Sequence, residues 1–381
     1  MSQHIVHVAD YGNRAPGSFV PAIVALANEL HLAGDRCSLI VKSVDDAVWH
    51  EAAARSLHSF AAASTPGEVF SLLRRSAPDV VHVHFAGWSF PATTAAYTRG
   101  ARVIWHLHSS MENGAGPLRR LARAGKYNWF GAGVHRFVAV CDSLRRAMID
   151  IGISPNRTKL LRNAVDTAHF RPPSTAERQR AREALGIAQS DRVVLYFGRD
   201  IDVKGADILW EALDDSPPVV LLGVGLPSRA VTELSARVST IALPFVADVA
   251  PLYWAADVLV MPSRREAAPY TMLEALCSGL PVISSNIAPL AEIAAQASGV
   301  LLVSNDPATF ARALCERFER RPVETEAVRA RFGLDRWVDG WNRRFEQRRV
   351  DLLERLELHE RLLQERRLHL QLRRRNLSLR Q

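Results

Sequence analysis

Short apolar runs alternate with amphipathic stretches along the first half of the chain. The runs are rich in β-branched residues, and the stretch 21–33 between two of them has the periodicity of a helix. This alternation is typical of a parallel sheet that is covered by helices on both faces. The pattern predicts strands over 5–8, 37–41, 80–84, 103–108 and 137–140.

The same pattern begins again in the second half. It predicts a strand over 193–197, a helix over 205–213 and further strands over 219–222 and 258–261. Between the halves lies the sequence Arg171-Pro172-Pro173-Ser174, whose prolines fix φ and lack amide donors, which suits a linker. We therefore predict an α/β fold with two Rossmann-like domains.

The last part of the chain is rich in leucine, arginine and glutamate, and it has no glycine or proline after residue 345. We expect one long helix there. Leucines recur every seven residues from Leu356 to Leu377, but the companion positions carry histidine and arginine, so a coiled-coil seam would be weak. A solvated charged helix, self-association and contact with an anionic membrane surface are the three alternatives.

The totals are those of a globular protein of two domains. The chain has 381 residues, more than one hydrophobic core usually covers, and 48% of them are apolar. Half of the formal charge of +8 comes from the segment 349–381, where arginines outnumber acidic residues nine to five. This tail lacks aromatic residues for base stacking, so nucleic acid is not an expected partner.

Cysteine usage and the N-terminus bear on metals and location. Cys37, Cys141, Cys277 and Cys315 are scattered without a metal-ligand spacing, so we expect reduced, mostly buried cysteines and no structural metal. The N-terminus shows no signal-peptide pattern, and no apolar run approaches the roughly 20 residues of a spanning helix. We expect a cytoplasmic protein, with peripheral contact at the inner face of the membrane through 346–381 as an option.

The segment 196–205 offers cations directly after a strand. Gly198 ends the predicted strand, and Arg199 and Lys204 follow five residues apart before the helix predicted from Gly205. Arginine supplies a bidentate fork, lysine a point charge and a helix start free amides, all of which favour phosphate oxygens. The segment predicts a diphosphate site, and its alternative is a surface loop with two unrelated cations.

Two glutamates eight positions apart follow the strand predicted over 258–261. Pro269 suits the first turn of a helix, so Glu266 would lie in the loop before it and Glu274 about a turn and a half inside it. We expect one carboxylate to accept hydrogen bonds from sugar hydroxyls and the other from a ribose diol, unless both are solvated helix charges. The backbone amides of Tyr270 and Thr271 would meet the phosphates between them.

This pair resembles the Glu-x7-Glu marker of glycosyltransferase family 4, whose members are retaining enzymes with the GT-B fold. The family's usual glycines after the first glutamate are replaced by alanine and proline at 267–269. The resemblance covers roughly residues 1–345, more strongly in the second half. Four further stretches resemble segments of the family in the same order. Residues 161–172 resemble its Pro-Asn-Gly-Val-Asp segment, 198–205 its Gly-Arg and Lys-Gly loop, 222–225 its Gly-x-Gly turn, and 255–263 its Ala-Ala-Asp strand that ends in Pro-Ser.

The resemblance implies two Rossmann-like domains that face a central cleft, followed by a C-terminal helical extension. The helical spacing of Trp337, Trp341 and Phe345 fits a helix that packs back on the first domain. We assign residues 1–171 to an acceptor-binding domain, 172–331 to a nucleotide-sugar-binding domain, 332–345 to the helix that crosses back to the N-terminal domain, and 346–381 to the charged helical tail.

The resemblance also implies roles for single residues. Arg199 and Lys204 would stabilise the diphosphate as it leaves, Glu274 would bind the nucleotide ribose, and Glu266 would contact the donor sugar. Fixed cations and amides can stabilise the growing negative charge without a metal. We therefore expect no metal and no cofactor, and a nucleotide-diphosphate sugar as the donor substrate.

The loop 11–18 follows the first predicted strand and resembles the family's glycine-rich first loop. Its glycines permit close approach of the backbone to a ligand. Gly17 and Ser18 are predicted to contact the donor or the acceptor, and an ordinary turn is the alternative.

Histidines gather at the ends of two predicted strands. His106 and His108 point to the same face because side chains alternate along a strand. His108 resembles the single histidine that the family places near the donor sugar, whereas His82, His84 and His106 are predicted to be structural.

The sequence thus predicts a hexosyltransferase that uses a nucleotide-sugar donor, with a UDP-sugar favoured, and a glycan, lipid-linked or natural-product acceptor. Such an enzyme would serve polysaccharide biosynthesis or a related pathway. A sugar-nucleotide epimerase, a phosphorylase and a non-catalytic scaffold of the same fold are the rival functions.

Overall fold

The computed structural model describes residues 2–13, 15–42, 49–85, 87–111, 117–198, 201–235, 238–316 and 323–345. Residues 1–337 form one compact unit that contains both predicted sheets, and the chain from residue 338 belongs to a second unit. The predicted tail 346–381 and Arg199 lie outside the described residues.

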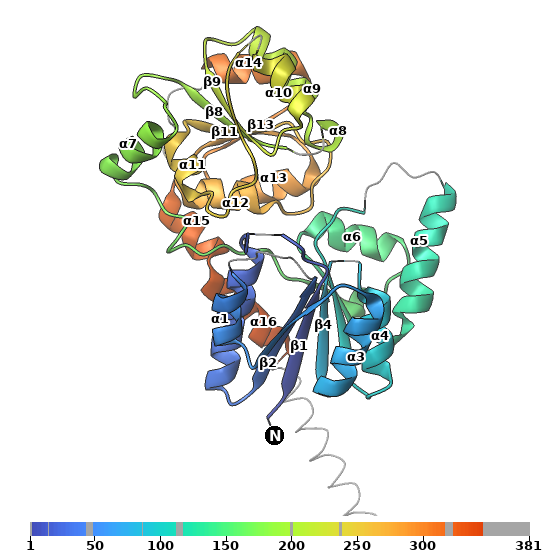
Figure 1. Cartoon of the computed structure of the whole chain (residues 1–381). Helices are drawn as coiled ribbons and strands as arrows, with labels where there is room; N and C mark the ends of the chain where they lie inside the picture. The colour runs from blue at the N-terminus through green and yellow to red at the C-terminus, as the bar shows by residue number, and fades with distance from the viewer. Residues whose placement is uncertain are drawn as a thin grey trace, which may run out of the picture. The chain divides into compact units, whose positions relative to one another are not determined.

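Among the described residues, the first sheet has seven parallel strands in the order β3-β2-β1-β4-β5-β6-β7, with helices on both faces (Figure 1). The strands are β1 His4–Ala9, β2 Arg36–Lys42, β3 Ser59–Ala63, β4 Val80–His84, β5 Arg102–Leu107, β6 Arg136–Ala139 and β7 Thr158–Leu160. The helices are α1 Phe19–Leu32, α2 His50–Ser56, α3 Pro66–Ser76, α4 Ser89–Tyr97, α5 Pro117–Trp129 and α6 Asp142–Asp150, with 3-10 turns η1 Phe130–Gly133 and η2 Pro155–Arg157.

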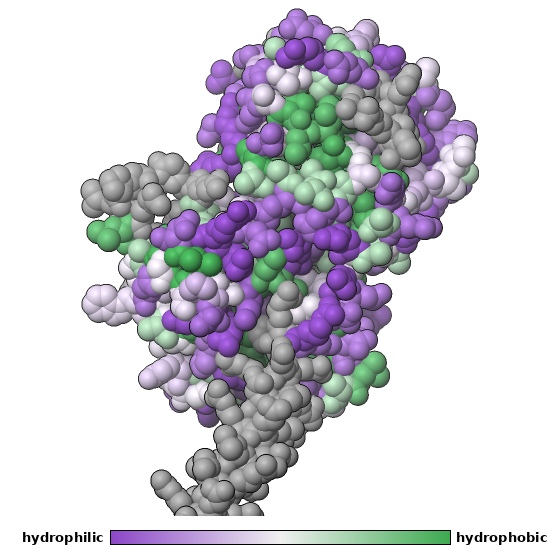
Figure 2. Space-filling model, turned by 180° about the vertical axis from the view of Figure 1, so that it is seen from behind, coloured by the Kyte–Doolittle hydropathy of each residue, from purple (hydrophilic) through white to green (hydrophobic). Residues whose placement is uncertain are grey.

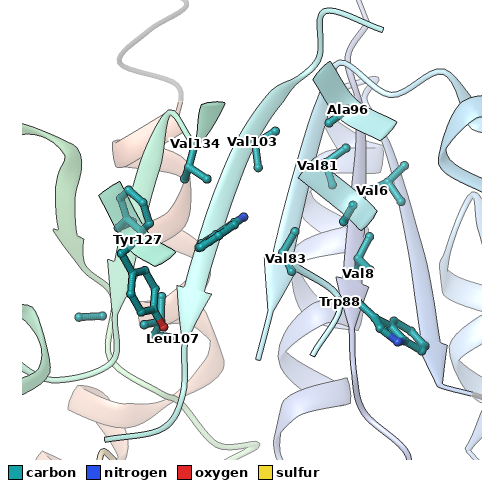
Figure 3. Packing of buried hydrophobic residues seen from close by; sticks show 14 of the residues in the cluster. Val6, Val8, Val81, Val83, Trp88, Ala96, Val103, Leu107, Tyr127 and Val134 are labelled. Atoms are coloured by element: carbon teal, nitrogen blue, oxygen red, sulfur yellow. The ribbon is translucent and has the colours of Figure 1, made fainter. Parts of the chain in front are cut away.

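One face of this sheet carries the apolar core that the alternating valines predict. Val6, Val8, Val81 and Val83 point to the same side and pack with residues of α3 and α4 (Figure 3). Trp105 lies in the same core, where its indole nitrogen donates a hydrogen bond to a helix hydroxyl. Burial of a row of β-branched side chains on adjacent strands stabilises this half of the protein.

Among the described residues, the second sheet has six parallel strands in the order β10-β9-β8-β11-β12-β13. They are β8 Val193–Phe197, β9 Val220–Val224, β10 Ser239–Leu243, β11 Val258–Met261, β12 Val282–Ser285 and β13 Val300–Val303. The helices of this half are α7 Thr175–Ala184, α8 Ile201–Lys204, α9 Ala206–Asp214, α10 Ser228–Ser235, α11 Ala250–Ala255, α12 Tyr270–Cys277, α13 Ala288–Ala294, α14 Pro307–Glu316 and α15 Thr325–Phe332.

Both faces of the second sheet are covered. Residues of α9 and α14 pack on one face, and residues of α11 and α12 pack on the other. The linker ends where Ser174 caps α7, because its hydroxyl accepts a hydrogen bond from the Glu177 amide and the Glu177 carboxylate accepts one from the Ser174 amide. The fold class, with two Rossmann-like parallel α/β halves, is confirmed, while the boundary at 171 and 172 stays a prediction.

Two local expectations need correction. Lys204 is the last residue of a short helix, α8, and a left-handed Gly205 with φ of 64° lies between α8 and α9, which begins at Ala206. Pro269 is the N-cap of α12 and not part of its first turn. The last described helix is α16 Leu334–Phe345.

The cysteines are mostly buried, as predicted. Cys37, Cys141 and Cys277 are buried, Cys315 is exposed, and all four are free.

The face drawn in Figure 2 is largely hydrophilic, with apolar residues in separate patches. Of the helices in the described part of the chain, none has the length and apolar character to cross a bilayer.

Candidate active site

Glu274 is a buried carboxylate on α12. Its side chain is 5% exposed, Oε1 accepts a hydrogen bond from the Ser18 hydroxyl at 2.6 Å, and Oε2 accepts one from the Tyr253 hydroxyl at 2.7 Å. Burial raises the pKa of Glu274, and the hydrogen bonds from Ser18 and Tyr253 oppose part of that rise. A buried carboxylate held by two hydroxyls is suited to bind further hydroxyls.

Ser18 reaches Glu274 because of the bend that precedes α1. Gly17 has φ of 50°, and a Cβ at this position would lie 2.8 Å from the Tyr11 hydroxyl oxygen. Ser18 occupies the N-cap position but makes no side-chain cap hydrogen bond, so its hydroxyl is directed to the carboxylate instead. The predicted contact residues Gly17 and Ser18 therefore lie beside the predicted ribose-binding glutamate, 256 positions away in the chain.

Lys204 and Glu266 form an ion pair. The Lys204 ammonium lies 2.6 Å from Glu266 Oε1, which also accepts a hydrogen bond from the Ser263 hydroxyl at 2.9 Å. The Glu266 side chain is 9% exposed and that of Lys204 is 32% exposed, so the carboxylate is the more enclosed partner. Sequence reasoning gave the two residues different ligand groups and did not foresee that they contact each other.

Two glycines let backbone segments approach closely around this pair. A Cβ on Gly205 would lie 2.0 Å from the Pro262 carbonyl oxygen. Gly198 donates its amide to the Val224 carbonyl oxygen at 3.1 Å, and a Cβ there would lie 2.1 Å from the Tyr196 hydroxyl oxygen. Larger residues at these positions would displace the segment that carries Lys204.

Tyr270 and Thr271 are the first two residues of α12, so their amides lie at the helix N-terminus as predicted. Burial raises the pKa of the Tyr270 hydroxyl, with the Tyr11 hydroxyl and Glu274 as further causes. The helix start and the Glu274 carboxylate thus belong to one local environment.

His108 follows β5 directly and faces the histidines of the neighbouring strand. Its Nε2 lies 3.2 Å from Nδ1 of His84, and its ring packs against Phe19 and Phe85. Burial lowers the pKa of His108 to about 3, and the Asn163 side chain opposes part of this shift. The ring is therefore neutral at physiological pH.

Asn163 connects this region with the loop of the first glutamate. Its amide nitrogen donates to the Ala268 carbonyl oxygen at 2.8 Å, two residues beyond Glu266. A pocket lies beside this contact, and its polar lining includes Arg162 and Glu292. Glu292 in turn accepts the backbone amides of Asp142 and Ser143 at 2.7 and 2.6 Å, so it caps α6.

The structure brings the candidate residues into two clusters. Ser18, Tyr253, Tyr270 and Glu274 form the first, and the second consists of Lys204, Ser263 and Glu266. Tyr253, Ser263 and the Asn163 contact were missed from the sequence. Ser263 carried a signal, since it lies in the Pro-Ser end of a strand, whereas Tyr253 lies on α11 with nothing in its spacing to distinguish it from a core residue.

Two family profiles match the chain. One, described as Glycosyltransferase Family 4, matches residues 22–169. The other, described as Glycosyl transferases group 1, matches residues 191–320. The first matched segment contains the strands β2 to β7 and the second contains β8 to β13, and together they contain most of the candidate residues.

Among curated proteins, the chain is 29% identical over 292 residues to a D-inositol 3-phosphate glycosyltransferase of Geodermatophilus obscurus, an alignment that covers 68% of this chain and 63% of that protein. It is 29% identical over 236 residues to a protein of the same name from Mycobacterium tuberculosis, covering 56% of this chain and 48% of that one. The chain thus spans about half to two thirds of the length of the curated relatives it matches.

Among solved structures, the Anabaena protein HepE in complex with UDP and glucose superposes with a TM-score of 0.76 at 18% identity, covering 91% of this chain and 100% of that one. This likeness extends over both sheets and supports the GT-B fold. With the two family profiles matched in order, one in each half of the chain, the chain is identified as a glycosyltransferase of the family 4 type.

Proposed function

We propose that this protein is a retaining glycosyltransferase that moves a sugar from a nucleotide-diphosphate sugar to an acceptor. The observation that carries the proposal is the buried Glu274 carboxylate, whose two oxygens already accept hydrogen bonds from hydroxyl groups of Ser18 and Tyr253. A carboxylate in this state is preorganised to accept hydrogen bonds from a ribose diol.

In this proposal the ribose hydroxyls replace the contact from Ser18, while Tyr253 continues to hold Oε2. The Tyr253 side chain is 1% exposed, and burial raises the pKa of its hydroxyl well above the ordinary value, so it stays a donor. The exchange of one hydroxyl donor for another keeps the buried carboxylate satisfied in both the empty and the occupied protein.

The diphosphate would lie between the two clusters. The amides of Tyr270 and Thr271 at the start of α12, together with Lys204, offer positive charge to its oxygens. When Lys204 turns to a phosphate, Glu266 is released from the ion pair and becomes available to a hydroxyl of the donor sugar. Arg199 would add a second cation from the segment next to Gly198.

Chemistry follows from the charge on the leaving group. The bond between sugar and phosphate breaks with negative charge growing on the diphosphate, and fixed donors aimed there lower the barrier without a metal. Neutral His108 would contact the donor sugar. The diphosphate itself would take the acceptor proton on the face that it leaves, which retains the anomeric configuration.

Donor and acceptor follow from the similar proteins as starting hypotheses. We favour a UDP-sugar, since HepE was captured with UDP and glucose. A phosphorylated inositol is the first acceptor to test, because the curated relatives are named for it. Glycan, lipid-linked and natural-product acceptors follow, and contact of the tail 346–381 with a membrane or a second copy stays a prediction.

Thermal unfolding against UDP-, GDP-, ADP-, CMP- and dTDP-sugars tests the donor site. A ligand at about 100 times its Kd stabilises the folded state by about 2.7 kcal/mol, which raises the Tm measurably. We expect a rise with one nucleotide family that is lost in Glu274→Ala and Lys204→Ala but kept in Glu211→Ala, an exposed glutamate of α9.

No shift with any donor would contradict the proposal and favour a non-catalytic scaffold. Conversion of a donor into another nucleotide sugar would indicate an epimerase, and sugar release that depends on inorganic phosphate would indicate a phosphorylase.

A further inference from the structure

Five histidines lie on one face of the first sheet, on three neighbouring strands. His7 pairs with His82 across β1 and β4, and His84 pairs with His106 across β4 and β5. His108 follows two residues beyond His106 on the same side. The face opposite the valine core of Figure 3 is therefore occupied by imidazole rings where Val, Ile or Leu would normally be found.

The rings are buried and close to one another. His7, His82, His84 and His106 are each at most 1% exposed, and His108 is partly exposed. Ring centroids of His106 and His108 are 4.3 Å apart. A metal-ligand nitrogen from each of His84, His106 and His108 lies within 4.8 Å of the other two.

Hydrogen bonds within the protein leave part of this cluster unsatisfied. Both ring nitrogens of His106 and Nε2 of His7 are buried without a hydrogen-bond partner among the described residues. Burial lowers the pKa of His106 well below its ordinary value, and the neighbouring rings of His108 and His82 lower it further. The Leu161 backbone opposes this shift, but it does not form a hydrogen bond of ordinary geometry with the ring. A buried neutral imidazole with free lone pairs is unfavourable unless something binds it.

We propose that His84, His106 and His108 bind a divalent transition metal ion of the zinc class. Nδ1 of His84 and Nε2 of His108 are 3.2 Å apart. Two nitrogens that bind one tetrahedral zinc ion at about 2.05 Å are separated by about 3.3 Å, so the separation of this pair already suits one ion, and the hydrogen bond between the two rings gives way when the ion binds. Three neutral histidines with one open position form a known zinc ligand set.

His7 completes the site as an outer partner. Its Nδ1 lies 2.9 Å from Nε2 of His84, on the side of the His84 ring that faces away from His108. When the metal binds Nδ1 of His84, the proton of His84 lies on Nε2 and forms a hydrogen bond to Nδ1 of His7. His7 then carries its own proton on Nε2. Only tautomers change, and no net proton is released. Metal-ligating histidines commonly donate their second nitrogen in this way.

The proposed metal site shares His108 with the sugar-transfer reaction, which is itself proposed to need no metal. A bound ion would hold the His108 ring that otherwise faces the donor sugar, so an occupied site would oppose donor binding. The test below reads metal binding directly and does not depend on transferase activity.

The experiment is a titration of the chelator-treated full chain with Zn²⁺ by calorimetry and with Co²⁺ by visible absorption. We expect one ion per chain, with the intense absorption of four-coordinate cobalt. His106→Leu removes a ligand and should abolish this binding, whereas His7→Phe removes only the outer partner and should weaken it about 10- to 100-fold. His31→Gln, an exposed histidine of α1, is the matched control and should bind as the wild type does.

Anomalous scattering at the zinc edge from wild-type crystals keeps the proposal testable if His106→Leu does not fold. A peak between His84, His106 and His108 supports it. A wild-type protein that binds neither ion, binding that survives His106→Leu, or a peak at another place would each overturn it.

Discussion

Replacing Glu274 by glutamine separates stability from donor binding at one position. The glutamine carbonyl can accept a hydrogen bond from one hydroxyl while its amide donates to the other, so Ser18 and Tyr253 both keep a partner. The buried charge is removed. The ribose diol, however, loses an ionised acceptor for its hydroxyl groups.

The expected loss of binding follows from the strength of hydrogen bonds to charged groups. Each contributes about 1.5–3 kcal/mol, and part of that returns through the neutral amide, so we expect UDP binding to weaken by about 2 kcal/mol, roughly 30-fold. Calorimetric titration with UDP measures this change. Glu211→Gln, at an exposed position on α9, is the control and should bind as the wild type does.

The stability of the empty protein should change in the opposite direction. The pKa of Glu274 is raised above its ordinary 4.5 in the folded protein, so its ionisation opposes folding. The contribution of this carboxyl group to the free energy of unfolding is fully present below pH 4.5, and it is lost as the pH rises through the raised pKa of the folded protein. Glu274→Gln lacks that loss, and its Tm at pH 7 should equal or exceed that of the wild type. A variant that both binds UDP as tightly as the wild type and unfolds earlier would refute this reasoning.

Two further predictions concern the second half of the chain. Gly205→Ala places a Cβ 2.0 Å from the Pro262 carbonyl oxygen at a φ of 64°. The variant should therefore lower the free energy of unfolding, measured by urea denaturation, by about 1–3 kcal/mol, and it should reduce donor turnover. Unchanged turnover would show that this close approach does not position Lys204. Arg182 is 1% exposed and donates hydrogen bonds to Asp257 and to four backbone carbonyl oxygens. Arg182→Met should therefore lower the free energy of unfolding by about 3–5 kcal/mol. A loss near zero would show that solvent reaches these groups.

Strands with strong patterns were predictable from the sequence. The valine-rich β4 and β8 begin and end at the predicted residues, because their side chains alternate or are buried on both faces. The strand β3, Ser59–Ala63, was missed, since its serine and alanines carry no strand preference and pairing with β2 determines its conformation.

The site was predictable as a set of residues and not as a set of contacts. The spacing of Glu266 and Glu274, and the position of Lys204 after the strand that ends at Gly198, identify the residues of the candidate site in the sequence. The hydrogen bond between Ser18 and Glu274, and the ion pair between Lys204 and Glu266, join segments 256 and 62 positions apart, and only the packed fold brings them together. His7 was overlooked for the same reason, because strand register places it beside His82 and His84.

In the proposed reaction, the bond between sugar and diphosphate breaks with retention, and Lys204 acts as a fixed cation. Proton NMR of the full chain with the nucleotide sugar that most raises its Tm follows this step directly, with water or phosphorylated inositol as the acceptor. We predict that the donor is consumed, that the first-formed product keeps the anomeric configuration of the donor, and that Lys204→Met slows consumption by about 100-fold. An unconsumed donor, an inverted first product, or a Lys204→Met variant as fast as the wild type would contradict the account.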